Sequence, residues 1–163
     1  MRARLFCFVG VSLWSAATLA HQATASADIP AEFRAHLRTG RFDVVSSIRG
    51  LPLGVRHQLQ TLFGGETLDI ADPGAPFRAG DETANGQLPS RRLVAAGCSY
   101  EDCLVYYQRG GRGAPTWRVL LLHWAPDATT FEWGGNAPGG LPTLETVRSA
   151  VLSGTIKGSS GPW

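Results

Sequence analysis

The sequence predicts a single α+β domain: an antiparallel β-meander of four to five strands, flanked by N-terminal helices and by one C-terminal helix. Between positions 92 and 133, short runs of strand-forming residues alternate with turn-forming loops. Two stretches before this region and one after it carry apolar residues at helical spacing. The length of 163 residues is sufficient for one domain with a substantial core and short for two.

The first 27 residues are typical of a secretory signal peptide. A start with two arginines precedes an apolar run over residues 5–19, and small residues at 23–27 offer a cleavage site. The apolar run is short for a bilayer span, and no later stretch reaches about 18 apolar residues. We therefore expect residues 28–163 to form one exported domain, periplasmic or secreted, without membrane insertion after signal removal.

The charge of this expected mature chain argues against nucleic-acid binding. Removal of Arg2 and Arg4 from the 15 basic residues leaves 13 against 13 acidic ones, so the net charge is near zero. The basic residues are scattered singly except for Arg91 and Arg92, and no basic patch indicates a nucleic acid or an anionic membrane as partner.

Two helices are expected before the meander. The first covers residues 28–40, where an aspartate can cap the start and a glycine ends the helix. The second runs from Pro52 to Gly64, with apolar residues at helical spacing: Val55, Leu59, Leu62 and Phe63. The pattern over residues 42–48 fits either a helix or a strand. Residues 66–89 are rich in turn signals, with room for brief strands at 68–71 and 77–79.

The meander is expected over residues 92–97, 104–108, 116–124 and 129–133, followed by a loop over 134–140. Both faces of the third strand are largely apolar, which predicts a central position in the sheet. One face carries Trp117, Val119, Leu121 and His123, and the other carries Arg118, Leu120, Leu122 and Trp124. Thr143 is expected to cap the final helix, which ends at Gly154.

Cys98 and Cys103 enclose a short loop between the first two strands of the meander. Cys7 lies in the expected signal peptide, so the exported chain keeps two cysteines, which most simply form one disulfide. Cysteines at facing ends of paired strands lie at a suitable distance for this bond. Closing so short a loop contributes only about 2 kcal/mol through chain entropy, and the larger expected effect is to hold residues 99–102 in one shape. A plain structural staple is the alternative role.

No motif for catalysis, a cofactor or a metal site is recognisable. His36, His57 and His123 fall on different elements without ligand-like spacing. A nucleophile elbow, a His-Glu-x-x-His motif and a phosphate loop are all absent from the sequence, since the glycine-rich residues 110–113 precede a strand. Four residues separate the two cysteines, unlike the two of a thioredoxin-type motif. We therefore expect no enzyme activity, metal or cofactor.

A hydrolase is the minor alternative, and it would require His57 or His123 to lie near Glu66 or Glu132 in a cleft. The aromatic residues of the meander favour a core role over a stacking platform for a ligand. They are Tyr106, Tyr107, Trp117, Trp124, Phe131 and Trp133.

The loop residues Ser99, Tyr100, Glu101 and Asp102 are the expected partner-binding site. Tyr100 is a rigid aromatic of the kind that anchors protein interfaces, and two acidic residues follow it. A fixed anionic tip would be steered toward a basic partner, with little loss of loop entropy on binding.

The sequence resembles the inhibitor of vertebrate lysozyme family, exported bacterial proteins with an antiparallel sheet, flanking helices and a disulfide-closed loop that enters the lysozyme cleft. The resemblance covers roughly residues 80–163 and includes the segments Gly80-Asp81-Glu82-Thr83, Ala96-Gly97-Cys98 through Cys103, and Ala150-Val151-Leu152-Ser153-Gly154. The family loop commonly reads Cys-Lys-Pro-His-Asp-Cys, and its histidine meets the two catalytic carboxylates of lysozyme. Here Glu101 stands at the histidine position, whereas Asp102 matches the family aspartate.

The resemblance implies a partner among lysozyme, other muramidases and lytic transglycosylases. A carboxylate at position 101 would face carboxylates, which is unfavourable unless one is protonated. The other hypothesis is a non-catalytic periplasmic binding or structural module without a lytic target. The sequence leaves a homodimer open.

Overall fold

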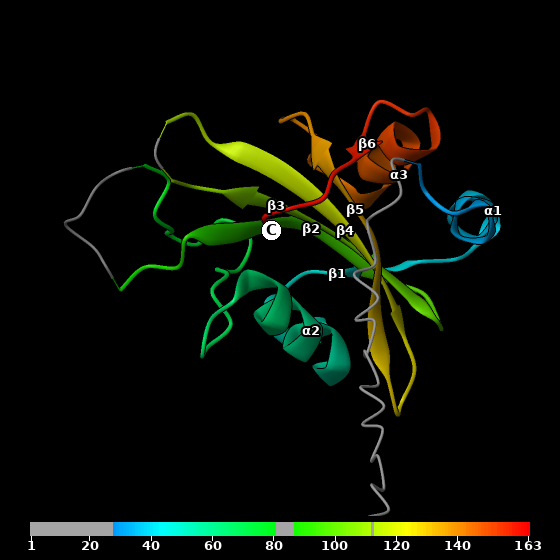
Figure 1. Ribbon diagram of the computed structural model, residues 1–163, viewed down its shortest axis with the longest axis horizontal. Coiled ribbons are helices and arrows are strands. Elements are labelled where there is room, and N and C mark those ends of the chain that lie inside the picture. Colours follow the sequence, from blue (N-terminus) through cyan, green and yellow to red (C-terminus); the bar gives the residue numbers. More distant parts are fainter. Residues whose placement is uncertain (1–27, 81–86, 112) are drawn as a thin grey trace, which may run out of the picture.

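The computed structural model describes residues 28–80, 87–111 and 113–163, and it contains a six-stranded antiparallel sheet with three α-helices (Figure 1). The expected signal peptide lies outside the described residues. The strands follow chain order across the sheet: β1 (Asp43–Val45), β2 (Arg91–Cys98), β3 (Asp102–Arg109), β4 (Thr116–Trp124), β5 (Thr129–Ala137) and β6 (Lys157–Gly158). The predicted α+β class with a β-meander is confirmed.

The helices occupy the three predicted stretches: α1 (Ala31–Thr39), α2 (Leu53–Phe63) and α3 (Leu144–Leu152). Gly64 ends α2 in the left-handed conformation, with φ of 70°, which costs glycine little. Thr143 starts α3 with a capping box, in which Thr143 and Thr146 bond each other's backbone N–H groups. None of the described helices combines the length and the apolar composition needed to cross a membrane.

The structure decides one segment that the sequence left open, and it differs from the prediction in several others. The ambiguous segment 42–48 forms the short edge strand β1 and leads into a 3₁₀ turn, Ile48–Gly50. Strand β3 begins at Asp102, two residues before the expected start, because Asp102 pairs with His123 of β4. Residues 68–71 contribute only a single bridge, between Ala71 and Arg92, and residues 77–79 form no strand.

Strand β5 continues to Ala137, so residues 134–137 of the segment expected to be a loop belong to the strand. The reason is the close approach of the C-terminal segment. A Cβ atom on Gly134 would lie 2.4 Å from the Trp163 ring, and one on Gly135 would lie 2.6 Å from the Lys157 carbonyl oxygen. Glycine is therefore required there for packing within a strand.

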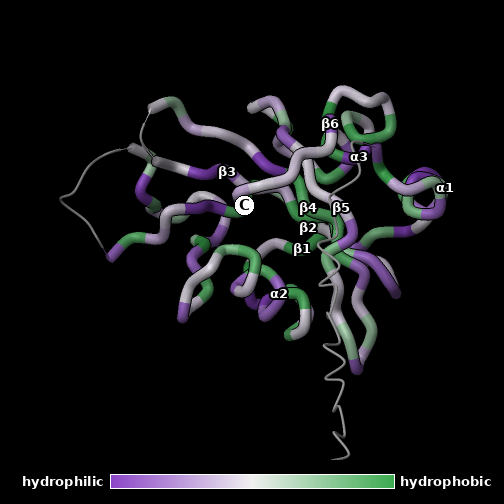
Figure 2. The backbone as a smooth tube through the Cα atoms, in the orientation of Figure 1, coloured by the Kyte–Doolittle hydropathy of each residue, from purple (hydrophilic) through white to green (hydrophobic). Residues whose placement is uncertain are grey.

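The sheet separates two hydrophobic layers, with β4 inside the sheet as predicted (Figure 1). Helices α1 and α3 cover one face, over Val119 and Leu121 of β4. Helix α2 covers the other face, over Leu120 and Leu122. Hydrophobic stretches gather where the middle of the sheet meets the helices (Figure 2). The aromatic residues of the meander belong to these layers: Tyr106, Tyr107 and Trp133 are buried, and Trp117, Trp124 and Phe131 are half-buried against them.

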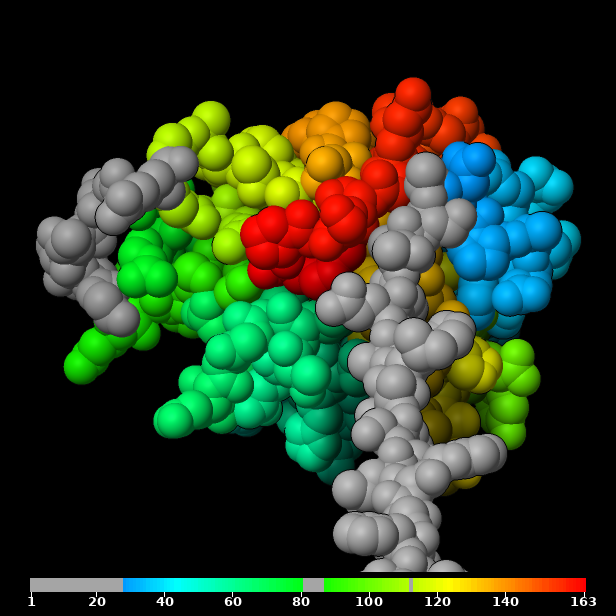
Figure 3. All heavy atoms as spheres, viewed as in Figure 1, coloured from blue at the N-terminus to red at the C-terminus, as the bar shows by residue number. Residues whose placement is uncertain are grey.

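The C-terminal segment completes the layer on the α2 side. Trp163 is 9% exposed and packs against Phe131, with 5.2 Å between the ring centroids. Figure 3 shows this segment, in red, lying against the atoms of α2. The chain end is thus part of the core.

Candidate functional site

The loop between β2 and β3 is closed by the expected disulfide. Cys98 and Cys103 are direct partners in the antiparallel register, and their sulfur atoms are bonded. In Figure 3 the loop, in green, projects at the lower right beneath α1 and beside the β4–β5 hairpin. This position leaves the tip accessible to a large partner.

Hydrogen bonds organise the loop as a tight turn. The Ser99 hydroxyl accepts from the backbone N–H groups of Glu101 and Asp102, at 3.3 and 3.0 Å. The Ser99 N–H donates to the Asp102 carbonyl at 2.7 Å. Strand β4 supports the turn through Trp124, whose backbone N–H donates to the Glu101 carbonyl at 2.7 Å and whose ring N–H donates to the Ser99 carbonyl at 3.3 Å. The turn is therefore held by both neighbouring strands as well as by the disulfide.

The loop presents Tyr100 and Glu101 to solvent and withdraws Asp102. Tyr100 is 88% exposed, an unusual placement for a large aromatic, and Glu101 is also exposed. The expectation that Asp102 shares this tip is wrong, because its side chain is only 4% exposed. Its side chain lies instead on the face of the sheet covered by α1, in contact with His36.

Asp102 is held between two histidines from different elements. Its Oδ2 atom lies 3.0 Å from Nδ1 of His36 on α1, and its Oδ1 atom lies 3.1 Å from Nδ1 of His123 on β4. As a carboxylate, Asp102 accepts a hydrogen bond from the His123 ring, and its contact with His36 is an ion pair when that ring is protonated. The His36–Asp102–His123 cluster therefore links α1, β3 and β4 at the base of the loop.

Burial of Asp102 and its contacts with the two histidines shift the pKa of its carboxyl group in opposite directions. Burial raises the pKa of Asp102, while the hydrogen bond from His123 and the charge of His36 act in the opposite direction. Exposed Glu101 adds a small further rise in the pKa of Asp102. The net direction is upward, so the site favours the protonated carboxyl more than water does.

A hollow of about 500 Å³ opens beside the cluster. Its lining combines the cluster with one aromatic and three acidic residues: Glu32, Phe33, His36, Glu101, Asp102, His123 and Glu132. The structure thus brings His123 and Glu132 together, which the sequence suggested as one condition for a hydrolase.

The chemistry of this hollow does not extend to a nucleophilic triad. In the described residues, neither His36 nor His123 bonds a serine, threonine or cysteine side chain, which nucleophilic catalysis by such a residue would need. The described part of the chain also has no group of three or more histidine, cysteine or acidic residues placed to hold a metal ion. The Nδ1 atoms of His36 and His123 both contact the Asp102 carboxylate.

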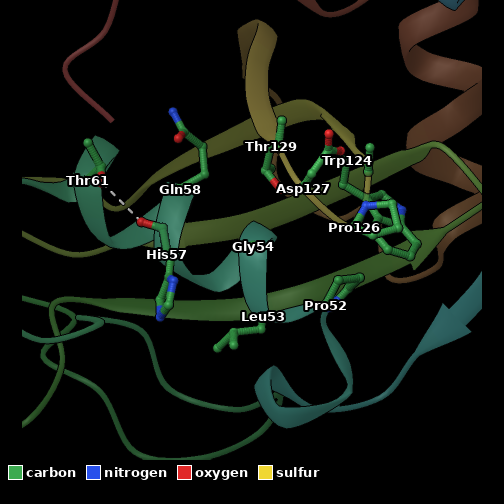
Figure 4. Close-up of a pocket in the computed structure, with 12 residues that line it drawn as sticks. Pro52, Leu53, Gly54, His57, Gln58, Thr61, Trp124, Pro126, Asp127 and Thr129 are labelled. Atoms are coloured by element: carbon green, nitrogen blue, oxygen red, sulfur yellow. Dashed lines mark hydrogen bonds between the residues drawn. The ribbon is translucent and has the colours of Figure 1, made fainter.

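His57 lies in a separate hollow of about 440 Å³ between α2 and the β4–β5 hairpin (Figure 4). Its lining includes Pro52, Leu53 and Gln58 on the α2 side, and Trp124 and Asp127 on the hairpin side. Glu66, the suggested partner of His57, is not part of this lining. In the view of Figure 4 the His57 ring points away from the hairpin.

The sequence did not predict the His36–Asp102–His123 cluster. Asp102 and His123 are direct cross-strand partners, so extending the third-strand pattern across the hairpin could have placed them together. No periodic signal connects His36 to either residue, because the packing of α1 on the sheet brings it there. Comparisons with known protein families, with curated proteins and with solved structures found no match to this chain.

Proposed function

We propose that this chain is an exported protein that binds a cell-wall lytic enzyme of the muramidase type through the disulfide-closed loop, and inhibits that enzyme. The observation that carries the proposal is the 88% exposed Tyr100 on a turn fixed by the disulfide and by Ser99. A tyrosine held in one position on an exposed turn is typical of the residues that anchor protein interfaces. The choice of a lytic enzyme as partner rests on the resemblance of the loop and its surroundings to lysozyme inhibitors.

In this proposal Tyr100 and Glu101 contact the partner, and Ser99 shapes the turn. Asp102 acts as a positioning residue, because its contacts are with His36 and His123 and not with solvent. A turn that is already ordered loses little conformational entropy on binding, which favours affinity from a small contact area.

Inhibition of a c-type lysozyme and of a bacterial lytic transglycosylase by the purified protein tests the proposal. We expect inhibition by the wild type, and at least a tenfold weaker inhibition by Tyr100→Ala, a loss typical of an interface anchor. Leu53→Ala is the matched control, because Leu53 is another exposed large apolar side chain, at 58%, and lies on α2 outside the loop.

Equal inhibition by the wild type and Tyr100→Ala would remove the loop from the function. Absence of inhibition of every lytic enzyme tested would favour the other hypothesis, a periplasmic binding or structural module.

The Glu101 position gives a second test. If Glu101 meets the catalytic carboxylates of a muramidase, binding strengthens as the pH falls from 7 to 5, because one carboxyl becomes protonated. Glu101→His, which restores the residue typical of the resembling family, should bind c-type lysozyme more tightly than the wild type at pH 7. A flat pH profile together with unchanged affinity of Glu101→His would exclude this geometry.

A further inference from the structure

A cluster of arginines lies at the end of the sheet opposite the disulfide-closed loop. Arg109 ends β3, and Arg118 lies in β4. In the antiparallel register Arg109 faces Thr116, and Tyr107 faces Arg118. Cross-strand partners share a face, and so do residues two apart in a strand, so these four side chains emerge together on one face.

In the described part of the chain, no acidic side chain pairs with either arginine. Among the described residues, no carboxylate lies within 4.0 Å of either guanidinium. Arg109 donates to the Pro162 carbonyl at 2.9 Å through Nη1, and Arg118 donates to the Asn136 side chain through Nη1. A guanidinium has five N–H donors, so both keep donors for a further ligand.

A buried polar atom without a partner belongs to one of these arginines. Among the described residues, the Nε of Arg118 is buried and has no hydrogen-bond partner. The buried Tyr107 hydroxyl lies close to Arg91 as well as to Arg118 and Arg109, and it does not line the hollow. Burial lowers the pKa of Arg118, and the positive charge of Arg109 lowers it further, against an opposite effect of Tyr107. Burial likewise raises the pKa of Tyr107 to about 12. An anion held here would relieve the repulsion between the two guanidinium groups.

A hollow of about 250 Å³ opens onto these groups. The described residues that line it include no acidic side chain, and they are Arg109, Gly110, Gly111, Ala114, Thr116 and Arg118. Two guanidinium groups and a hydroxyl offer more donors than the two oxygens of a carboxylate accept, whereas a phosphate or phosphate ester has enough acceptor oxygens.

We propose that this hollow is a binding site for a phosphate group, held by Arg109 and Arg118 from adjacent strands and by the Thr116 hydroxyl. The site is independent of the loop, because the β2–β3 and β3–β4 turns lie at opposite ends of the sheet (Figure 1). It requires no rearrangement of the strands, since both arginines already line the hollow.

Calorimetric titration of the purified protein with inorganic phosphate, at constant ionic strength set with sodium chloride, tests the site. We expect saturable binding at one site, weakened about tenfold or more by Arg118→Gln or Arg109→Gln because each change removes charge-assisted hydrogen bonds. Arg38→Gln is the matched control, since it removes the same charge from an exposed position on α1 and should leave phosphate affinity unchanged.

Thr116→Val provides a second variant in case an arginine variant does not fold. Thr116 is exposed, so the fold should tolerate the change while phosphate affinity falls several-fold.

Phosphatidylcholine vesicles with and without phosphatidic acid distinguish the sources of the phosphate. If the protein sediments only with vesicles that contain phosphatidic acid, and Arg109→Gln does not, the ligand is a lipid headgroup. If the protein binds phosphate but does not sediment with either kind of vesicle, the ligand is a small soluble phosphate.

Either of these vesicle results agrees with the proposed site. The absence of saturable phosphate binding by the wild type would overturn it. Unchanged affinity in folded Arg118→Gln and Thr116→Val, or an equal loss in Arg38→Gln, would overturn it too, because the binding would then not depend on this hollow.

Discussion

Asp102 is the residue at which three elements meet. Its Oδ1 atom is hydrogen-bonded to His123 of β4, and its Oδ2 atom lies 3.0 Å from Nδ1 of His36 on α1. Its backbone begins β3 immediately after the loop. A buried carboxylate without such donors would be strongly unfavourable. The cluster therefore fixes where α1 lies relative to the base of the loop.

The titration of Asp102 predicts how stability depends on pH. Its pKa is raised in the folded protein above the unfolded value of about 3.9, so the folded state binds this proton more tightly. The stability contributed by Asp102 is then largest at low pH and falls as the pH rises through the folded pKa. We expect the free energy of unfolding of the wild type, minus that of Asp102→Asn, to decrease from about pH 4 upward and then level off.

Urea unfolding of both proteins over this pH range measures the difference. A difference that increases with pH would mean that pairing with the histidines outweighs burial and lowers the pKa of Asp102.

At the scale of elements, β5 shows why a glycine pair can lie inside a strand. Gly134 and Gly135 allow Trp163 and the Lys157 backbone to approach the sheet more closely than any side chain would permit. The short edge strand β6 pairs with β5 at this position, with Gly158 opposite Gly135.

Gly135→Ala should therefore destabilise the protein by about 1–3 kcal/mol, the usual effect of forcing an extra carbon into a packed site. The added Cβ would lie 2.6 Å from the Lys157 carbonyl oxygen, a backbone atom that cannot move alone. Gly80→Ala is the control, because a Cβ there meets no atom of the described residues within 4 Å. Chemical denaturation measures both variants, and equal stability of the two would show that β6 moves away without loss.

At the scale of the whole molecule, the two faces of the sheet are closed by different parts of the chain. Helices α1 and α3 close one face, and α2 together with the C-terminal Trp163 closes the other. Arg91 of β2 links two distant segments beside this second layer, because it donates hydrogen bonds to Asp69 at 2.7 Å and to the Trp163 carbonyl at 2.5 Å. Residues far apart in sequence thus depend on one another for burial.

Trp163→Ala should lower the free energy of unfolding by about 3 kcal/mol, because it leaves a cavity beside Phe131 and over Gly134. Tyr100→Ala is the matched aromatic control and should change stability little, since Tyr100 is 88% exposed. Thermal unfolding of both variants checks the contrast. A similar loss in both would place Tyr100 in a structural role and weaken its assignment to partner binding.

The sequence by itself determined the α+β class, the three helices and the central place of β4, because these depend on local periodicity and capping. It also predicted the pairing of Cys98 with Cys103, since facing strand ends bring them together. Only the tertiary structure decided the burial of Asp102, its contact with His36, and the arginine-lined hollow. Each depends on register and on helix docking between distant segments, which local spacing does not encode. Tyr100 was recognisable from its place in the loop. Its exposure at the tip, beside a buried Asp102, is visible only in the tertiary structure.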